Sequence, residues 1–254
     1  MRLDNRVAIV TGAGTGIGRE ICYSYAKEGA DVAVVYSSSR AGAEETVAGV
    51  EAMGRRALLI QANIADPVQI KNMVDVTYKE FGRIDILVNN AAARNNAGLL
   101  DYSVEYWDEC INTNLRGCFL AMQAVAPIMM KQKYGKIINV ASVMGYRPAM
   151  EGRAAYASSK TAMMALTKSA AAELAQYGIF VNAFAPGTIA TPIAYQSVDP
   201  KMAVSLERLN NCVPQRRRGE AGDMAGPALF LATDESSYVN GVCFLVDGGW
   251  AAVD

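Results

Sequence analysis

The chain has 254 residues, 52% of them hydrophobic, and a formal net charge of −1. A chain of this length and apolar content is expected to fold as one domain over residues 1–254, and its interspersed charges argue against nucleic-acid binding. It contains no histidine, and its five cysteines include no Cys-x-x-Cys pair. We therefore expect no metal site, no disulfide framework and no Ser-His-Asp hydrolase.

The N-terminal residues 1–6 show no signal-peptide pattern, and no apolar run approaches the ~20 residues that a membrane span requires. We therefore expect a cytoplasmic protein that does not associate with membranes.

Apolar segments typical of buried strands alternate along the chain with segments of helical pattern. The expected strands lie near 6–11, 31–36, 56–62, 84–89, 135–142, 178–184 and 241–246, and the expected helices near 16–29, 40–54, 66–81, 101–131, 152–177 and 221–235. This alternation predicts the α/β class, as a single Rossmann-type, doubly wound parallel sheet with helices on both faces. The stretch from Pro192 to Arg218 departs from it, so we expect either a substrate lid near 190–218 or a subunit contact there.

The first strand runs directly into a glycine-rich turn that is followed by a helix. Gly12, Gly16 and Gly18 give the spacing G-x-x-x-G-x-G, with Thr15 and Ile17 between them. Glycines permit a tight turn and a close approach of backbone N–H groups to a phosphate, and the helix N-terminus adds partial positive charge. The turn is therefore a predicted pyrophosphate site.

A second pattern combines Tyr156 and Lys160, four residues apart in a helical segment, with Ser142 at the end of a buried strand. Residues spaced by four leave the same face of a helix. An ammonium beside a phenol favours the phenolate, which brings proton transfer within reach of neutral pH. We expect Tyr156 to act as general acid or base on a carbonyl or hydroxyl, with Ser142 donating a hydrogen bond to the same oxygen.

Together these features resemble the short-chain dehydrogenase/reductase family from about residue 3 to residue 250. The further motifs that carry the resemblance are Asn89-Asn-Ala-Ala92, Asn114 in a predicted helix, Pro186-Gly-Thr-Ile189 and Phe244-Leu-Val-Asp-Gly-Gly249. The resemblance implies the strand order 3-2-1-4-5-6-7 and hydride transfer to or from a nicotinamide cofactor. It also implies a catalytic tetrad of Asn114, Ser142, Tyr156 and Lys160.

The resemblance further implies which residues contact the cofactor. Beyond the glycine turn, these are Asn63, Ile64, Asn90, Ala91, Tyr156, Lys160, Pro186, Gly187, Thr188, Ile189 and Thr191. Lys160 is expected to bind the nicotinamide ribose, and Thr188 and the Ile189 backbone to orient the carboxamide. Asn114 is expected to hold a water that links Lys160 to solvent.

The chain departs from the family pattern at four points. The spacing from Ser142 to Tyr156 is one residue longer than the family pattern leads us to expect, Asn63 replaces an aspartate that meets adenine, and Ala92 replaces a glycine. The fourth departure is the segment from Tyr36 to Arg40, which contains no acid.

That fourth departure bears on the choice of cofactor. A carboxylate after the second strand would bond the ribose 2′-hydroxyl of NAD and repel a 2′-phosphate. Ser37, Ser38 and Arg40 are instead suited to a phosphate, so we favour NADP over NAD. Thr15 stands where NADP-preferring relatives often carry Arg or Lys, and a solvated Arg40 at a helix start is the alternative.

The substrate is expected to be a small polar molecule, such as a sugar or polyol, that meets Ser142, Arg94, Arg147, Arg153 and Tyr195. Reduction of a 3-oxoacyl thioester is the alternative enzyme function. Relatives that accept carrier-linked substrates dock an acidic carrier on basic residues after the catalytic lysine, where this chain has Ala172.

Two further expectations concern assembly and class. The family resemblance implies a homotetramer, and the predicted helices at 101–131 and 152–177 are apolar enough to be covered twice. A dinucleotide-sensing or scaffold role is the non-enzymatic alternative, and it would not require the four tetrad residues that this chain keeps. The Arg216-Arg-Arg218 run is interpreted as surface charge or a subunit contact.

Overall fold

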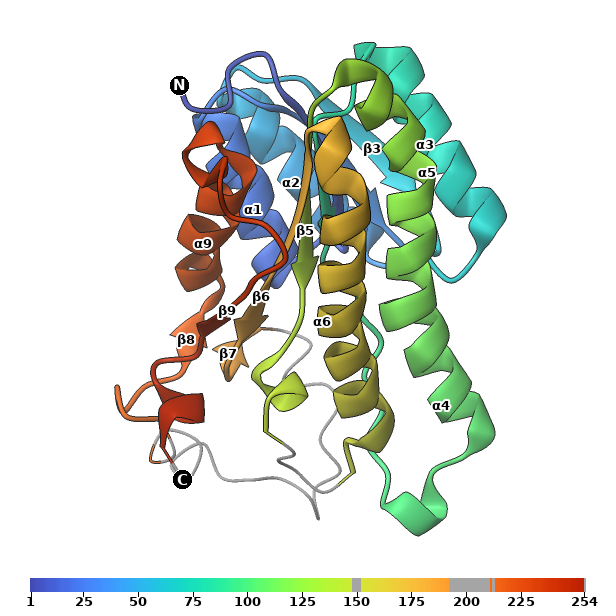
Figure 1. Cartoon of the computed structure of the whole chain (residues 1–254), viewed down its shortest axis with the longest axis vertical. Helices are drawn as coiled ribbons and strands as arrows, with labels where there is room; N and C mark the ends of the chain where they lie inside the picture. The colour runs from blue at the N-terminus through green and yellow to red at the C-terminus, as the bar shows by residue number, and fades with distance from the viewer. Residues whose placement is uncertain (148–151, 192–210, 212, 254) are drawn as a thin grey trace.

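The computed structural model describes residues 1–147, 152–191, 211 and 213–253, and its centre is a seven-stranded parallel sheet (Figure 1). The strands are β1 (Val7–Thr11), β2 (Asp31–Tyr36), β3 (Ala57–Gln61), β4 (Ile86–Asn89), β5 (Gly135–Val140), β6 (Ile179–Pro186) and β9 (Cys243–Val246). Their order is β3-β2-β1-β4-β5-β6-β9. Because β9 is the seventh strand of this sheet in chain order, the predicted class and strand order are confirmed.

Helices cover both faces of the sheet (Figure 1). Residues of α1 (Gly16–Lys27), α2 (Arg40–Ala52) and α9 (Ala225–Ala232) share one apolar core cluster with the sheet, and residues of α3 (Pro67–Phe81), α5 (Gly117–Gln132) and α6 (Ala154–Leu174) share the other. On β1, Ala8 and Val10 belong to the first cluster, whereas Ile9 between them belongs to the second. Both faces of a strand are therefore buried, which explains why the strands read as continuous apolar runs.

The predicted helix at 101–131 is interrupted. A short 3-10 turn (Leu99–Asp101) precedes α4 (Val104–Ile111), and a π-helical turn (Asn112–Arg116) separates α4 from α5. At the end of this turn Gly117 packs against the Ile64 backbone, where a Cβ would lie 2.4 Å from the carbonyl oxygen. Turns of the π type concentrate at functional sites, and this one carries Asn114.

The remaining short elements lie mostly in the second half of the chain. They are β7 (Ile189–Ala190) and β8 (Gly219–Glu220), which pair in parallel, and the 3-10 turns Val143–Gly145, Ala175–Tyr177, Ala221–Met224, Asp234–Ser236 and Trp250–Ala252. The predicted helix at 221–235 is thus shortened to α9 between two 3-10 turns. Within the described ranges, no helix is both long and apolar enough to cross a membrane.

A chain of buried hydrogen bonds fixes α6 on the sheet. Asn89 Nδ2 of β4 donates to Asn139 Oδ1 of β5 over 2.9 Å, and Asn139 Nδ2 donates to Thr167 Oγ1 of α6 over 2.9 Å. All three side chains are buried. Because a buried polar group that loses its partner is costly, these bonds define one position of α6 along β5. Helix α6 is the element that carries Tyr156 and Lys160.

We predict that Gly18→Ala destabilises the protein whereas Gly226→Ala does not. A Cβ on Gly18 would stand 2.3 Å from the Gly12 carbonyl oxygen and 2.7 Å from Asn90 Nδ2, whereas a Cβ on Gly226 would meet nothing within 4 Å. Both glycines are helical. The overpacked variant should lose about 2–3 kcal/mol of unfolding free energy, and the control should change by less than ~1 kcal/mol. Urea unfolding measures both, and equal stability of the two variants would contradict the packing argument.

Candidate active site

An open cleft of about 650 Å³ lies beyond the carboxyl ends of the strands, where ligands bind in open α/β sheets. Among the residues that the structure describes, it is lined by Gly12, Gly14, Thr15, Gly16, Ile17, Tyr36, Ser37, Ser38, Ser39, Ala62, Asn63, Ile64, Ala65, Asn90, Ala91, Ala92, Ala93, Arg94, Glu109, Asn112, Thr113, Val140, Ala141, Ser142, Tyr156, Lys160, Pro186, Gly187, Ile189 and Thr191. The cleft therefore brings the predicted glycine turn, the end of β2 and the predicted acid/base residues into one site.

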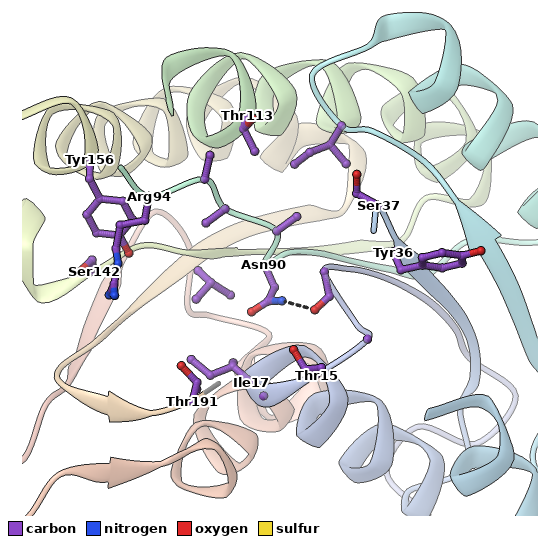
Figure 2. Close-up of a pocket in the computed structure, with 18 of the residues that line it drawn as sticks. Thr15, Ile17, Tyr36, Ser37, Asn90, Arg94, Thr113, Ser142, Tyr156 and Thr191 are labelled. Carbon is purple, nitrogen blue, oxygen red and sulfur yellow. Dashed lines mark hydrogen bonds between the residues drawn. The ribbon is translucent and has the colours of Figure 1, made fainter. Parts of the chain in front are cut away.

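The glycine turn is built as a strand, turn and helix. Gly12 and Gly16 have φ of +64° and +56°, a region that side chains disfavour, and α1 begins at Gly16. The wall beside the turn is the loop after β4, because Asn90 Nδ2 donates to the Thr11 and Gly12 carbonyls over 2.8 and 3.0 Å. Figure 2 shows Asn90 beside the turn with one of these bonds as a dashed line. Backbone N–H groups and a helix N-terminus face the cleft here, which is the arrangement that binds phosphates.

The end of β2 presents hydroxyl groups rather than a carboxylate. Tyr36, Ser37, Ser38 and Ser39 line the cleft at this end. Among the described residues that line the cleft, Glu109 is the one carboxylate, and its Oε2 accepts a hydrogen bond from Asn95 Nδ2 over 2.8 Å.

The neighbouring loop after β3 contributes Asn63 and Ile64 to the cleft. Asn63 Oδ1 accepts from the Ala65 backbone over 3.0 Å, and the Asn63 backbone donates to Gln69 Oε1 over 2.8 Å. The Asn63 side chain is thus fixed as part of a turn at the edge of the cleft.

Three predicted cofactor residues do not line the cleft. Gly18 packs against Gly12 and Asn90, and its function is to let α1 approach the loop. Arg40 is exposed, and its Nε donates to Glu44 Oε1 over 2.8 Å, one helical turn away on α2. Thr188 Oγ1 is buried without a hydrogen-bond partner among the described residues.

Ser142 and Tyr156 lie on one wall of the cleft (Figure 2), and Lys160 lines the cleft with them. Ser142 follows β5 and its oxygen accepts from the Met144 backbone over 3.2 Å. Lys160 Nζ lies 5.7 Å from the centroid of the Tyr156 ring and donates to the Val140 carbonyl over 2.6 Å. The predicted spatial pairing of phenol and ammonium is therefore present, and the carbonyl of β5 sets the position of the ammonium.

Asn114 is a buried centre of hydrogen bonds rather than a cleft-lining residue. Its Oδ1 accepts from the Ala93 backbone over 2.8 Å, and its Nδ2 lies 3.0 Å from the Ala93 carbonyl, 3.0 Å from Ser159 Oγ and 3.2 Å from Cys110 Sγ. Ser159 in turn donates to the Tyr156 carbonyl over 2.7 Å. The side chain thus connects the loop after β4 to the helix that carries Tyr156.

The arginines proposed for substrate lie in different places. Arg94 lines the cleft beside Ser142 and Tyr156, and Arg153 immediately precedes α6. Arg147 is not brought to the cleft, because its Nη1 donates to the Trp250 and Val253 carbonyls over 2.8 and 2.7 Å and so fixes the C-terminal segment. Tyr195 and most of the expected lid near 190–218 lie outside the described residues, as does part of the lengthened loop between Ser142 and Tyr156.

Sequence reasoning missed several residues around the cleft. Asn112 and Thr113 line it because the π-helical turn brings them forward, and no sequence signal marks that turn. Arg218 was interpreted as a surface charge or subunit contact, but it is half-buried and its Nη2 donates to the Ile189 carbonyl over 2.8 Å. No sequence signal marks this contact, because the two-residue strand β8 that follows Arg218 forms only by pairing with β7 in the fold.

Comparison with known proteins places the chain among characterised relatives. The family model described as short chain dehydrogenase matches residues 6–201. The 3-oxoacyl-[acyl-carrier-protein] reductase FabG of Staphylococcus epidermidis is 40% identical over 245 residues, which cover 96% of this chain and 98% of that protein.

Two solved structures are similar over nearly the whole chain. NAD+-bound xylitol dehydrogenase has a TM-score of 0.91 at 32% identity, covering 98% of this chain and 100% of that one. A short chain dehydrogenase from Burkholderia cenocepacia J2315 in complex with NADP has a TM-score of 0.91 at 35% identity, covering 100% of both chains.

We predict that Asn114→Ala lowers the unfolding free energy by about 2–4 kcal/mol, because the N–H and carbonyl of Ala93 lose their buried partner. Asn72→Ala is the matched control at an exposed position of α3 and should change stability by less than ~0.5 kcal/mol. Urea unfolding of both variants measures the difference. Equal stability would show that the Asn114 bonds do not hold the loop.

Proposed function

The chain belongs to the short-chain dehydrogenase family and is an oxidoreductase, and we propose that it transfers a hydride between a nicotinamide dinucleotide and the carbonyl or secondary alcohol of a small polar substrate. The observation that carries the proposal is the convergence of Ser142, Tyr156 and Lys160 on one wall of a cleft that begins at a glycine turn. We further propose that the whole 254-residue chain works as one catalytic domain.

The described residues fit a nicotinamide dinucleotide. The glycine turn and the start of α1 would hold the pyrophosphate, and the β2 and β3 ends would hold the adenosine. At the other end, Thr188 does not itself line the cleft but lies between Gly187 and Ile189, which do, and its buried Oγ1 has no partner among the described residues, so a small movement would offer it to the amide of a nicotinamide. When bound, the cofactor supplies the carbon that gives or takes the hydride.

The protein's own residues would manage the proton. In the oxidative direction Tyr156 takes the proton of the substrate hydroxyl as the hydride leaves the carbinol carbon, and in reduction it returns that proton to the carbonyl oxygen. Ser142 would donate a hydrogen bond to the same oxygen. The Val140 carbonyl accepts a hydrogen bond from Lys160 Nζ and so holds that nitrogen near the Tyr156 ring.

Asn114 takes a positioning role in this scheme. That it holds a water for Lys160 stays a prediction, and its side-chain hydrogen bonds go to Ala93, Cys110 and Ser159. We propose that it keeps the loop after β4 and the first turn of α6 at a fixed separation, and thereby sets the width of the cleft between Ala93 and Tyr156.

A small polar substrate is favoured over a carrier-linked thioester by the surface of α6. Ala172 is exposed on the helix that carries Lys160, and the exposed residue after it is Glu173. Neither side chain supplies the positive charge that would attract an acidic carrier protein. Reduction of a 3-oxoacyl thioester is the alternative function, because the S. epidermidis relative is named as a reductase of that kind. Turnover of a 3-oxoacyl thioester in preference to small ketones would establish this alternative.

We propose that the chain assembles as a homotetramer through the outer faces of α4 and α5. Val104, Trp107 and Phe119 are exposed apolar side chains on these helices. Exposed groups of this kind mark surfaces that another protein copy covers.

We predict that Tyr156→Phe loses turnover by about 10²–10⁴-fold while the fold and cofactor affinity remain, because the phenol oxygen acts on the substrate proton. Tyr238→Phe, at a fully exposed tyrosine, is the matched control. Nicotinamide fluorescence with a panel of ketones and secondary alcohols measures the rates. Wild-type turnover by Tyr156→Phe would exclude the mechanism, whereas cofactor binding without turnover by the unmodified protein would favour the sensing role.

We predict that the enzyme uses NADP more efficiently than NAD. No carboxylate lines the cleft at Ser37 and Ser38 in the described chain, and Arg40 can turn from Glu44 towards a 2′-phosphate. Arg40→Ala should raise the KM for NADP about tenfold and leave the KM for NAD unchanged. Lys71→Ala, at an exposed cation on α3, is the control. A higher kcat/KM with NAD would overturn this preference.

A further inference from the structure

Arg94 occupies the reacting end of the cleft. It lines the cleft with Ser142 and Tyr156, at the opposite end from Tyr36 and Ser37 (Figure 2). It directly follows the segment after β4 in which Asn90 is bonded to Gly12 and Ala93 is bonded to Asn114, so the chain leading to it is held in place. A guanidinium here is within reach of a bound substrate and lies away from the glycine turn that suits the cofactor phosphates.

A second guanidinium, that of Arg153, lies near Arg94 at the start of α6, although Arg153 is not among the described residues that line the cleft. It immediately precedes α6, three residues before Tyr156, and its Nη1 is buried without a hydrogen-bond partner among the described residues. No carboxylate in the described chain forms an ion pair with it. Burial and the charge of Arg94 lower the pKa of Arg153 to about 10, against a smaller opposing effect of Tyr156 and Tyr102.

The electrostatics of Arg94 agree with this placement. Its pKa is lowered, first by burial and then by the charge of Arg218, whereas Tyr156 acts in the opposite direction. The charges of Arg218 and Tyr156 thus act on Arg94, and the charge of Arg94 acts on Arg153. An anion bound beside Arg94 and Arg153 would offset the desolvation of the Arg153 guanidinium, whose Nη1 is buried without a hydrogen-bond partner among the described residues.

We propose that the substrate carries an anionic group, a carboxylate, sulfonate or phosphate, near the reacting carbon, and that Arg94 and Arg153 bind it. This inference rests on the proposed function of the same site. Guanidinium groups bind such oxyanions through paired charge-assisted hydrogen bonds. The redox step leaves the acid unchanged: the hydride passes from the carbinol carbon to the cofactor, the hydroxyl proton passes to Tyr156, and the alcohol becomes a ketone.

Matched substrate pairs test the inference through turnover. The pairs are 3-hydroxybutyrate with methyl 3-hydroxybutyrate, 2-hydroxypropane-1-sulfonate with 1-(methylsulfonyl)propan-2-ol, and glycerol 1-phosphate with glycerol. At least one anion should exceed its neutral partner in kcat/KM by about 100-fold, and that pair identifies the acid. In Arg94→Gln and Arg153→Gln the ratio should fall about tenfold or more, whereas Arg56→Gln, at an exposed position directly before β3, should leave it unchanged.

A binding measurement keeps the inference testable without turnover. With saturating NADP+ or NAD+ present, millimolar malonate, methanesulfonate or inorganic phosphate should raise the melting temperature of the unmodified protein, and the rise should be lost in Arg153→Gln. The inference would be overturned if every neutral substrate had a kcat/KM equal to or above that of its anionic partner, or if no anion raised the melting temperature. Either result would leave the proposed hydride transfer intact. Anion-dependent stabilisation together with no turnover of any alcohol or ketone would instead support the anion site and contradict the proposed function.

Discussion

The close approach of two backbone segments determines the geometry of the whole site. The Gly12 carbonyl oxygen occupies the position beside α1 that any side chain at residue 18 would need, and the Asn90 amide donates to the same carbonyl. The turn after β1 and the loop after β4 are therefore one packed unit. A dinucleotide needs both, because the turn offers N–H groups to its phosphates and the loop forms the adjoining wall of the cleft. This explains why residue 18 is glycine although it never touches the cleft.

The loop after β4 also contacts α6, the helix that carries Tyr156 and Lys160. The loop after β4 leaves Asn90 and passes Ala93, where the Asn114 side chain satisfies both the N–H and the carbonyl. Asn114 is also bonded to Ser159 of α6, and the buried chain from Asn139 to Thr167 fixes that helix lower down. Fully satisfied buried networks are rigid, since each member that moved would leave an unpaired polar group. Polar contacts as well as apolar packing therefore fix the glycine turn, which suits phosphates, at a constant position relative to Tyr156, which transfers the proton.

The sequence predicted the parts of this arrangement that depend on local chemistry. Apolar runs such as Val7–Thr11 specify strands buried on both faces, the alternation of strands and helices specifies the sheet, and a spacing of four places Tyr156 and Lys160 together.

The π-helical turn was not predicted, because it depends on the contact of Asn114 with a loop distant in sequence and on the fit of Gly117 against Ile64. Arg147 was predicted to contact the substrate because its actual partners, the Trp250 and Val253 carbonyls, are distant in sequence and could not be predicted from it. Arg40 differs, since its pairing with Glu44 follows from a spacing of four and was readable in the sequence.

The arginines at the reacting end bear on the choice between the two kinds of substrate. A 3-oxoacyl thioester is neutral at its reacting group and carries its negative charge on a distant carrier, so it would bring no anion to this end of the cleft and would leave Arg153 to be compensated by water. Water cannot do this well for Arg153, whose Nη1 is buried. A small oxidised or reduced acid brings its own negative charge to that position and leaves the hydroxyl within reach of Tyr156 and Ser142. The same guanidiniums would then disfavour uncharged sugars, because binding one would desolvate the Arg153 guanidinium without adding a negative charge. Charge rather than shape would select the substrate of this enzyme.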